Sequence, residues 1–516
     1  MNGKKACIVI NPRAGQNIVK LPDMLAIFAA AGWKTDIAIK EYGGQTMELA
    51  TRAAEKNYDL VIGYGGDGTL CQVVNGVMNA KGQHSRVALI PGGTANVWAS
   101  EVGIPVDPVK AALTLVSSEC RKVDIGHVEI ESLIFPGAAQ DEQAGAGAQA
   151  SQDEQQMQER KVKSTPTAKH HFMLMAGLGI DAAVMGHVSK PLKYKIGPLA
   201  VGLSAAKELP AQHPFPVEIR ANGGGRKGEV LWKGEAIQVV VGNTRRYADV
   251  VEMTPNAYID DGILDICVIT AGDPLNTLQQ ISSLLLRRHP DNTSAEYFHG
   301  AHLSISAPAS VDMQLDGSAV KLKDYLGKAD RAALQQADNL EQVMVNYRFD
   351  VMPRALRVAI PSNYDDALFE HSSHKEVAHE MTTQEQGEQE KQGKQTSEQQ
   401  DEDSSRKKDQ PSGEEDKSSL SQLGALMDNG REVTVIGATK IPAKKRTYIV
   451  AGTAVKQLTG EIKPVAVRID EDTTIIKRTG EHVSPAFVLG LPEGEHIVVE
   501  GKKSKRGVIR ATRMLV

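Results

Sequence analysis

The sequence predicts an α/β fold with four parts: a parallel-sheet lobe, an antiparallel β-sandwich lobe, a disordered linker and a small OB-like β-barrel. Between residue 5 and about residue 125, short apolar segments alternate with helical patterns. β-rich segments follow from about 170 to 350 and again from about 430 to 516. The intervening residues 371–428 contain no Phe, Trp, Tyr or Ile, so they lack the apolar surface that would repay ordering.

The first lobe, residues 1–130, has strands and helices in alternation. We expect strands at 6–10, 35–39, 60–64 and 87–90, and helices at 21–31, 47–56, 70–78 and 109–116. Elements in this order form a largely parallel sheet covered by helices. A flexible insertion is expected at 137–168, where large apolar residues are almost absent.

The second lobe, residues 169–362, has strand-like segments separated by Gly, Asn and Pro, which is typical of an antiparallel sandwich. Helical patterns at 191–208 and 275–288 interrupt it. The disordered linker is placed at 363–428. Five short alternating segments within 429–516 predict the closed barrel.

Composition narrows the class of protein. The chain has 516 residues and a formal net charge of −5, which argues against a protein dedicated to nucleic acid. Its four cysteines form no CxxC or Cys/His pattern, so neither a disulfide framework nor a zinc site is implied. The N-terminus lacks the pattern of a signal peptide, so we expect a cytoplasmic protein.

Three glycine-rich turns indicate which chemistry the protein performs. Gly65-Gly66-Asp67-Gly68-Thr69 follows one predicted strand and opens a helix at Leu70. Glycines let backbone N–H groups approach a phosphate, and a helix N-terminus favours negative charge. Asp67 would hold Mg²⁺ on the phosphates or accept the proton of an attacking hydroxyl. The alternative is a tight turn with an Asp cap.

The other two glycine-rich turns also lie directly after predicted strands. Pro91-Gly92-Gly93-Thr94-Ala95-Asn96 and Asn11-Pro12-Arg13-Ala14-Gly15 each follow a predicted strand. Turns at the carboxyl ends of neighbouring parallel strands form one crevice, so we predict a phosphate-binding site there. None of the three matches the GxxxxGK[ST] or GxGxxG fingerprint.

In this order and spacing, the three turns resemble the catalytic domain shared by bacterial diacylglycerol/lipid kinases, eukaryotic diacylglycerol kinases, and sphingosine and ceramide kinases. The resemblance continues through 176–182, 241–243, 255–265 and 314–317 and closes at 352–358. It covers roughly 1–362, apart from 137–168 and a smaller insertion near 325–340. It implies an ATP- and Mg²⁺-dependent kinase that phosphorylates a lipid alcohol such as diacylglycerol.

The resemblance also implies site residues. A metal ion would be held by the Asp261 side chain and by the carbonyls of Tyr258 and Ile263; the alternative is that 260–262 form a plain hairpin turn. The catalytic candidates are Asp67 and Asp316. The nucleotide-binding candidates, including those that the second turn adds, are Asn11, Pro12, Arg13, Ala14, Gly15, Gly65, Gly66, Asp67, Gly68, Thr69, Leu70, Cys71, Gly92, Gly93, Thr94 and Asn96.

One departure bears on catalysis. The family's Asp-Gly-Glu, whose Glu is assigned as proton acceptor, is Asp316-Gly317-Ser318 here. Serine cannot act as that base, so Asp316 or Asp67 takes the proton, a water bridges through Ser318, or catalysis is weak or absent. Further departures at Ile39, Cys71-Gln72 and Val97 bear on the nucleotide pose and the acceptor.

The sequence is also compatible with two other functions and with several kinds of binding partner. An NAD kinase-like enzyme shares the GGDGT turn, and a nucleotide- or lipid-binding regulator would result if catalysis were lost. Residues 190–199 combine cations with apolar residues and would rest transiently on the inner membrane face or pack as a core helix. The basic segment 502–506 is interpreted as a solvated loop. A homodimer is compatible with the sequence, and the barrel's partner is unassigned.

Overall fold

The computed structural model describes residues 4–12, 18–82, 84–136, 158–165, 168–179, 214–222, 228–247, 251–270, 295–370, 426, 430–442, 444, 446–455, 461–504 and 507–516. These form two compact units. The first comprises Met1–Ile18, Thr35–Pro108 and Ser118–Pro361, and the second comprises Val19–Lys34, Val109–Ser117 and Ser362–Val516. The predicted helices at 191–208 and 275–288 and the basic segment 190–199 lie outside the described residues.

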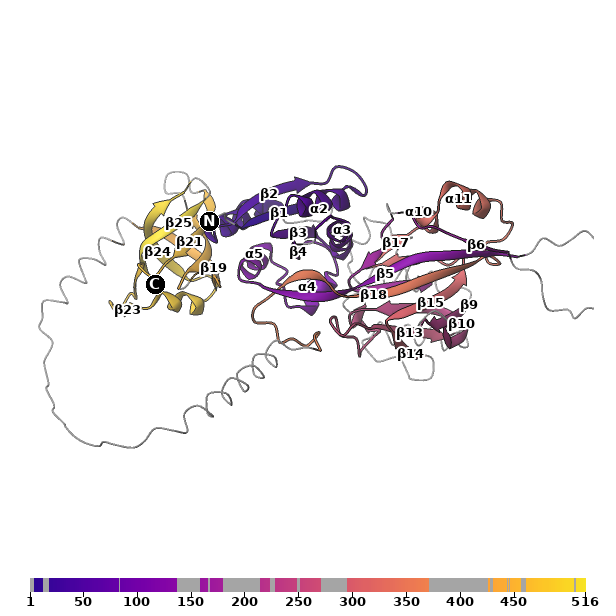
Figure 1. Cartoon of the computed structure of the whole chain (residues 1–516). Helices are drawn as coiled ribbons and strands as arrows, with labels where there is room; N and C mark the ends of the chain where they lie inside the picture. Colours follow the sequence, from indigo (N-terminus) through magenta and orange to yellow (C-terminus); the bar gives the residue numbers. More distant parts are fainter. Residues whose placement is uncertain are drawn as a thin grey trace, which may run out of the picture. The chain divides into compact units, whose positions relative to one another are not determined.

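The first lobe is built on the parallel sheet that the sequence predicts (Figure 1). Strands β1 (Lys5–Ile10), β2 (Lys34–Ile39), β3 (Leu60–Gly65) and β4 (Arg86–Pro91) lie in the order β4-β3-β1-β2. β3 pairs in parallel with both β1 and β4. β3 is buried at all six positions, as expected for a strand covered on both faces.

The helices of the first unit's parallel-sheet lobe are α2 (Gln45–Glu55), α3 (Asp67–Met78) and α4 (Val97–Glu101). α1 (Leu21–Ala30), which the 3₁₀ turn η1 (Ile18–Lys20) precedes, and α5 (Pro108–Val116) belong almost entirely to the second unit. α3 buries most of its residues against its neighbours. No helix among the described residues is long and apolar enough to cross a membrane.

Two long antiparallel strands join the lobes of the first unit. β5 (Glu119–Phe135) and β18 (Met344–Ile360) pair along most of their 17-residue lengths. The end of β18 pairs in parallel with β4. β18 includes 352–358, the segment expected to return to the first lobe, and a single 16-stranded sheet therefore runs through both lobes.

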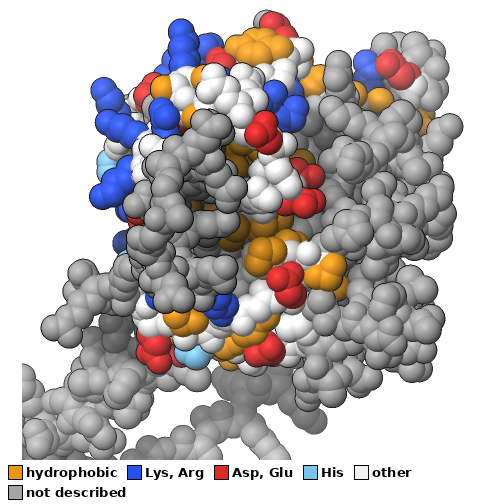
Figure 2. Space-filling view, turned by 90° about the vertical axis from the view of Figure 1, so that its right-hand side faces the viewer, with side chains coloured by type: hydrophobic (Ala, Val, Ile, Leu, Met, Phe, Trp, Pro, Cys, Tyr) orange, Lys and Arg blue, Asp and Glu red, His pale blue; other side chains and the backbone are white. Residues whose placement is uncertain are grey.

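The second lobe is the predicted antiparallel sandwich around an apolar core that includes Phe172, Ile219, Val239 and Phe349. Figure 2 views this lobe end-on, with Lys and Arg side chains gathered along the upper left edge. Its further strands are β6 (Gln158–Lys161), β7 (His171–Phe172), β8 (Met175–Gly179), β9 (Phe215–Ala221), β10 (Glu229–Gly242), β11 (Arg246–Tyr247), β12 (Val251–Glu252), β13 (Leu264–Thr270), β14 (Ala295–Gly300), β15 (His302–Pro308), β16 (Met313–Leu315) and β17 (Ser318–Val320).

Two segments that were predicted to be insertions contain secondary structure. Within the predicted insertion 137–168, β6 pairs with the edge of β5, whose backbone groups would otherwise lack partners. Near the predicted insertion at 325–340, two short helices follow β17: α10 (Leu322–Tyr325) and α11 (Lys328–Gln335). α10 is tied to the core because its Tyr325 side chain is fully buried.

The second unit contains the predicted five-stranded barrel. Strands β19 (Arg431–Lys440), β20 (Tyr448–Val455), β21 (Ile462–Ile469), β24 (His496–Lys503) and β25 (Val508–Leu515) close through a parallel β21–β25 pair. β22 (Thr474–Ile476), β23 (His482–Val483) and η3 (Pro485–Gly490) complete it. At the start of the predicted linker 363–428, Leu368 and Phe369 are buried; residues 371–425 lie outside the described part of the chain.

One glycine fixes how closely α3 packs on α2. A Cβ atom at Gly76 would lie 2.7 Å from the Cβ of Ala50 and closer still to the Met47 carbonyl oxygen. The Thr51 hydroxyl also donates a hydrogen bond of 2.9 Å to the Gly76 carbonyl. There is no room for a side chain at this contact.

We predict that Gly76→Ala destabilises the protein, although alanine favours helices over glycine. The forced separation of α2 and α3 should cost about 1–3 kcal/mol of unfolding free energy, measured by urea denaturation. Gly43→Ala is the matched control, because a Cβ at Gly43 meets nothing within 4 Å. An equal effect of the two substitutions would contradict the packing argument.

Candidate functional site

Two of the predicted glycine turns meet at the carboxyl edge of the parallel sheet. The Gly92 N–H donates a 2.9 Å hydrogen bond to the Gly65 carbonyl. A Cβ atom built on Gly66 would lie 3.0 Å from the Gly93 Cα atom, so the two backbones approach too closely for side chains. Asn96 holds the second turn, since its amide oxygen accepts the Gly93 N–H at 2.9 Å.

The third predicted turn is described only in part. The Asn11 N–H donates to the Tyr64 carbonyl at 3.2 Å, and its side-chain amide lies 3.4 Å from the Thr69 hydroxyl. Asn11 thus lies beside the first turn of α3, and Pro12 follows it in the chain. Arg13, Ala14 and Gly15 are outside the described residues. The side chains of Leu70 and Cys71 are fully buried.

Asp67, the first residue of α3, connects the two glycine turns. Its carboxylate accepts the N–H of Val97 at 3.0 Å and the N–H of Trp98 at 3.2 Å. These are the first two residues of α4, whose N–H groups have no partner within the helix. Asp67 therefore caps α4 and not its own helix, whose N-cap is Gly66, so the alternative of a tight turn with a local Asp cap is not what the structure has. Its predicted catalytic role stays a prediction.

Asp316 is buried at the end of β16. Its carboxylate accepts three backbone N–H groups, from Met173 at 3.0 Å, Leu174 at 2.8 Å and Met175 at 3.1 Å. Burial raises the pKa of Asp316 to about 6, although these three hydrogen bonds favour the charged form. Only 3% of the residue is exposed, so its carboxylate holds the segment before β8.

The Asp316-Gly317-Ser318 turn faces the start of α3. A Cβ atom at Gly68 would lie 2.9 Å from the Ser318 hydroxyl oxygen. Asp316 has a φ of 47° and Gly317 a φ of 70°, so both are left-handed in this turn. The structure thus brings the turn with the missing glutamate to the phosphate-type turn of the first lobe.

A buried amide, which the sequence did not single out, links α3 to the second lobe. The Asn75 side-chain oxygen accepts the N–H groups of His170 and His171, both at 3.0 Å. Its nitrogen donates to the carbonyls of His171 at 2.7 Å and Cys71 at 2.8 Å. Asn75 and Asp316 therefore bind neighbouring backbone groups of one segment, 170–175.

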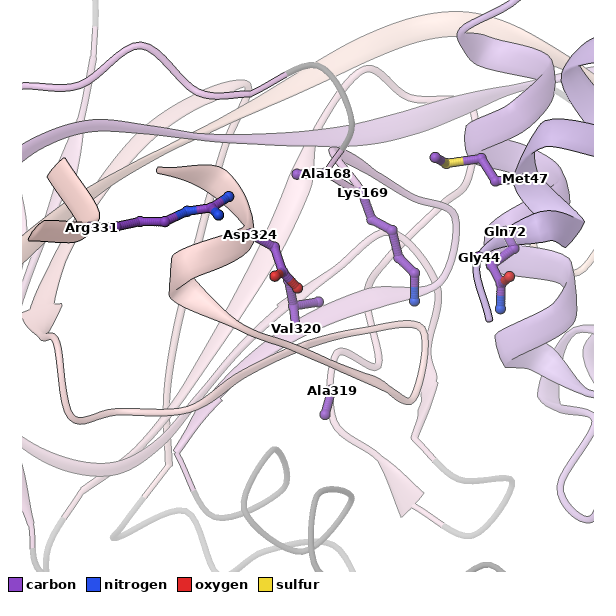
Figure 3. Close-up of a pocket in the computed structure, with 9 residues that line it drawn as sticks. All are labelled: Gly44, Met47, Gln72, Ala168, Lys169, Ala319, Val320, Asp324 and Arg331. Atoms are coloured by element: carbon purple, nitrogen blue, oxygen red, sulfur yellow. The ribbon is translucent and has the colours of Figure 1, made fainter. Parts of the chain in front are cut away.

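A cavity of about 350 Å³ lies beside these turns (Figure 3). α2 and α3 contribute Met47 and Gln72, and the second lobe contributes Lys169, Ala319, Asp324 and Arg331. These residues could not be singled out from sequence as a group, because they come from separate segments of the chain. Asp324 and Arg331 belong to α10 and α11, next to or within the predicted insertion.

The predicted metal residues lie in one turn, 258–263. The Asp261 carboxylate accepts the Ile263 N–H at 2.9 Å, and Arg245 lies 4.7 Å from the centre of the Tyr258 ring. The turn is held by Asp124, whose carboxylate accepts the N–H groups of Gly262 and Arg354. Burial raises the pKa of Asp124. One carboxylate and two carbonyls fit a hard cation such as Mg²⁺ in donor type.

A second group of metal-type ligands was not predicted. His127, Glu129 and His170 have ligand atoms within 4.8 Å of one another. However, the His170 ring nitrogens lie 2.9 and 2.8 Å from the carbonyls of Val128 and Thr165, and Glu129 pairs with Arg348. Two of the three ligands, His170 and Glu129, are therefore already used by the protein.

Each of the two lobes matches a different protein family. Residues 5–128 match the family described as "Diacylglycerol kinase catalytic domain". Residues 175–360 match the family described as "YegS C-terminal NAD kinase beta sandwich-like domain". The two matched regions meet at the turns described above.

Similar proteins include enzymes named "Diacylglycerol kinase". That of Staphylococcus saprophyticus is 26% identical over 341 residues, covering 66% of this chain and 94% of the relative. That of Bacillus subtilis is 26% identical over 317 residues, covering 61% and 89%. A solved diacylglycerol kinase from Bacillus anthracis is 18% identical with a TM-score of 0.46, covering 70% and 99%. Residues 5–128 thus match the diacylglycerol kinase catalytic domain, and the chain is similar to bacterial diacylglycerol kinases over both lobes.

Proposed function

We propose that this protein is an ATP-dependent lipid kinase that transfers the γ-phosphoryl group of ATP to the hydroxyl of a lipid such as diacylglycerol. One observation carries the proposal: the glycine turns of β3 and β4 meet backbone to backbone, and the turn at 316–318 faces them from the second lobe. Phosphoryl transfer depends mainly on positioning and on charge stabilisation. Two lobes that present turns to one point would position the two substrates, and the backbone N–H groups of the turns would stabilise negative charge.

The phosphate side of the proposed site consists of backbone atoms. Backbone N–H groups of the turns 65–69 and 92–96 would bind the nucleotide phosphates, apart from those of Thr69, Gly92 and Gly93, which bond within the protein. Asn11, Pro12 and Thr94 would lie alongside. α3 begins at Asp67, and the positive end of its dipole favours an anion there. Mg²⁺, when bound, would offset phosphate charge. In the second lobe, Tyr258, Asp261 and Ile263 would hold a further, structural Mg²⁺.

The two predicted catalytic aspartates receive different roles. We assign Asp67 to the metal and acceptor-hydroxyl side of the reaction, because it stands within the phosphate turn. The Asp316 carboxylate is buried and binds three N–H groups, which supports a positioning role: it fixes the turn that carries Ser318. Proton transfer would then use Asp67 or a water beside Ser318.

Two alternatives remain as outcomes of the test. The matched sandwich family is named after NAD kinase, so NAD belongs among the acceptors tested. A regulator that binds nucleotide or lipid without turnover would bind ATP and label none of the acceptors. Transfer of labelled γ-phosphate to a panel of lipid alcohols and NAD distinguishes all three functions.

We predict that Asp67→Asn lowers the rate of lipid phosphorylation by at least about 100-fold, the usual scale for a lost acid–base or metal-binding group. Loss of label from the lipid product, with the circular dichroism spectrum unchanged, is the expected result. Asp338→Asn, at an exposed carboxylate of the second lobe, is the control and should keep full activity. Normal turnover by folded Asp67→Asn would refute the assignment.

We also predict that Ser318→Glu raises the turnover number by about tenfold or more, because it places a carboxylate where the turn faces Gly68. Ser318→Gln has the same length without the base and should show no gain. The measurement is initial rate at saturating ATP and lipid. If the glutamine variant gains as much as the glutamate variant, the missing base is not what limits the rate.

A further inference from the structure

The cavity beside the 316–318 turn carries charges that the proposed reaction does not use. At about 350 Å³ it is within the usual range for small-ligand pockets. Lys169 enters it from the segment before β7, and Arg331 from α11. Figure 3 shows the Lys169 amine in the middle of the opening, between Gln72 on one side and Asp324 on the other.

The two cations form no ion pair within the described part of the chain, although Asp324 lines the same cavity. Neither Lys169 nor Arg331 lies within ion-pair distance of a described carboxylate there. The Arg331 Nε donates to the Leu326 carbonyl at 2.9 Å, which fixes one edge of the guanidinium and leaves its terminal nitrogens for a ligand. Two such cations in one cavity favour an anion with several acceptor oxygens.

Gln72 adds an unsatisfied acceptor to the wall. Its Nε2 donates to the Gly68 carbonyl at 3.2 Å, whereas its Oε1 is buried without a hydrogen-bond partner. A buried acceptor without a donor is costly, but this oxygen is closed to solvent, so a ligand hydroxyl or N–H reaches it only if the Gln72 side chain turns toward the cavity.

The cavity adjoins the proposed point of transfer. Gln72 lies one turn along α3 from Gly68, and Ala319 follows Ser318. We propose that this cavity binds a phosphate-type anion through Lys169 and Arg331. The anion would be the phosphate of an anionic phospholipid head group or a phosphate of the nucleotide. Binding alone tests this inference, so it can fail or hold independently of the proposed phosphoryl transfer.

The test uses the full chain in two arms without turnover. One arm measures ADP affinity by calorimetry, and the other measures co-sedimentation with phosphatidylcholine vesicles with and without phosphatidylglycerol. Lys169→Gln and Arg331→Gln should each weaken binding about tenfold in the arm whose ligand occupies the cavity, since each removes a charge-assisted hydrogen bond. The affected arm identifies the source of the phosphate.

Two further variants sharpen the result. Asp324→Asn removes the negative charge from the same cavity and should strengthen binding in the same arm. Lys328→Gln removes an exposed cation of α11 that does not line the cavity, and should change nothing. If Lys169→Gln or Arg331→Gln does not fold, Ala319→Glu replaces it and should weaken binding. Unchanged binding in both arms, or an equal loss with Lys328→Gln, would overturn the proposal.

Discussion

The candidate site depends on how two buried polar side chains hold one segment, residues 170–175. Asn75 from α3 binds the N–H groups of His170 and His171, and Asp316 binds those of Met173, Leu174 and Met175. A buried N–H group without a partner costs about 1–3 kcal/mol. Replacing Asn75 or Asp316 by an apolar residue would therefore destabilise the segment that each one binds. Because Asn75 belongs to the first lobe and Asp316 to the second, this segment sets the phosphate turn against the 316–318 turn.

The parallel sheet, its glycine turns and the barrel could be predicted from sequence, because each depends on a pattern of neighbouring residues. The alternation of apolar segments and helical patterns predicted the parallel sheet, and the glycine turns could be placed at its carboxyl edge before any coordinates. The approach of Gly66 to Gly93 then shows why glycine occupies both positions. The barrel was predictable in the same way, since its strands are short, alternating and contiguous.

The contacts that join the lobes could not be predicted, because their residues are far apart in the chain and of common types. Asn75 lies in the middle of a predicted helix, and no neighbouring residue indicates that its side chain would bind the backbone of His170. Asp124 likewise holds the 258–263 turn across a separation of 138 residues. Lys169 and Arg331 share a cavity only because β17, α10 and α11 fold back beside α3.

We propose that the segment 170–175 aligns the two turns for phosphoryl transfer. The most direct measurement compares ATP affinity with the rate of phosphate transfer to lipid in wild type and Asn75→Ala. Asn75→Ala should greatly lower transfer with little change in ATP affinity, because the glycine turns are held by their own backbone contacts. Unchanged transfer in folded Asn75→Ala would contradict it.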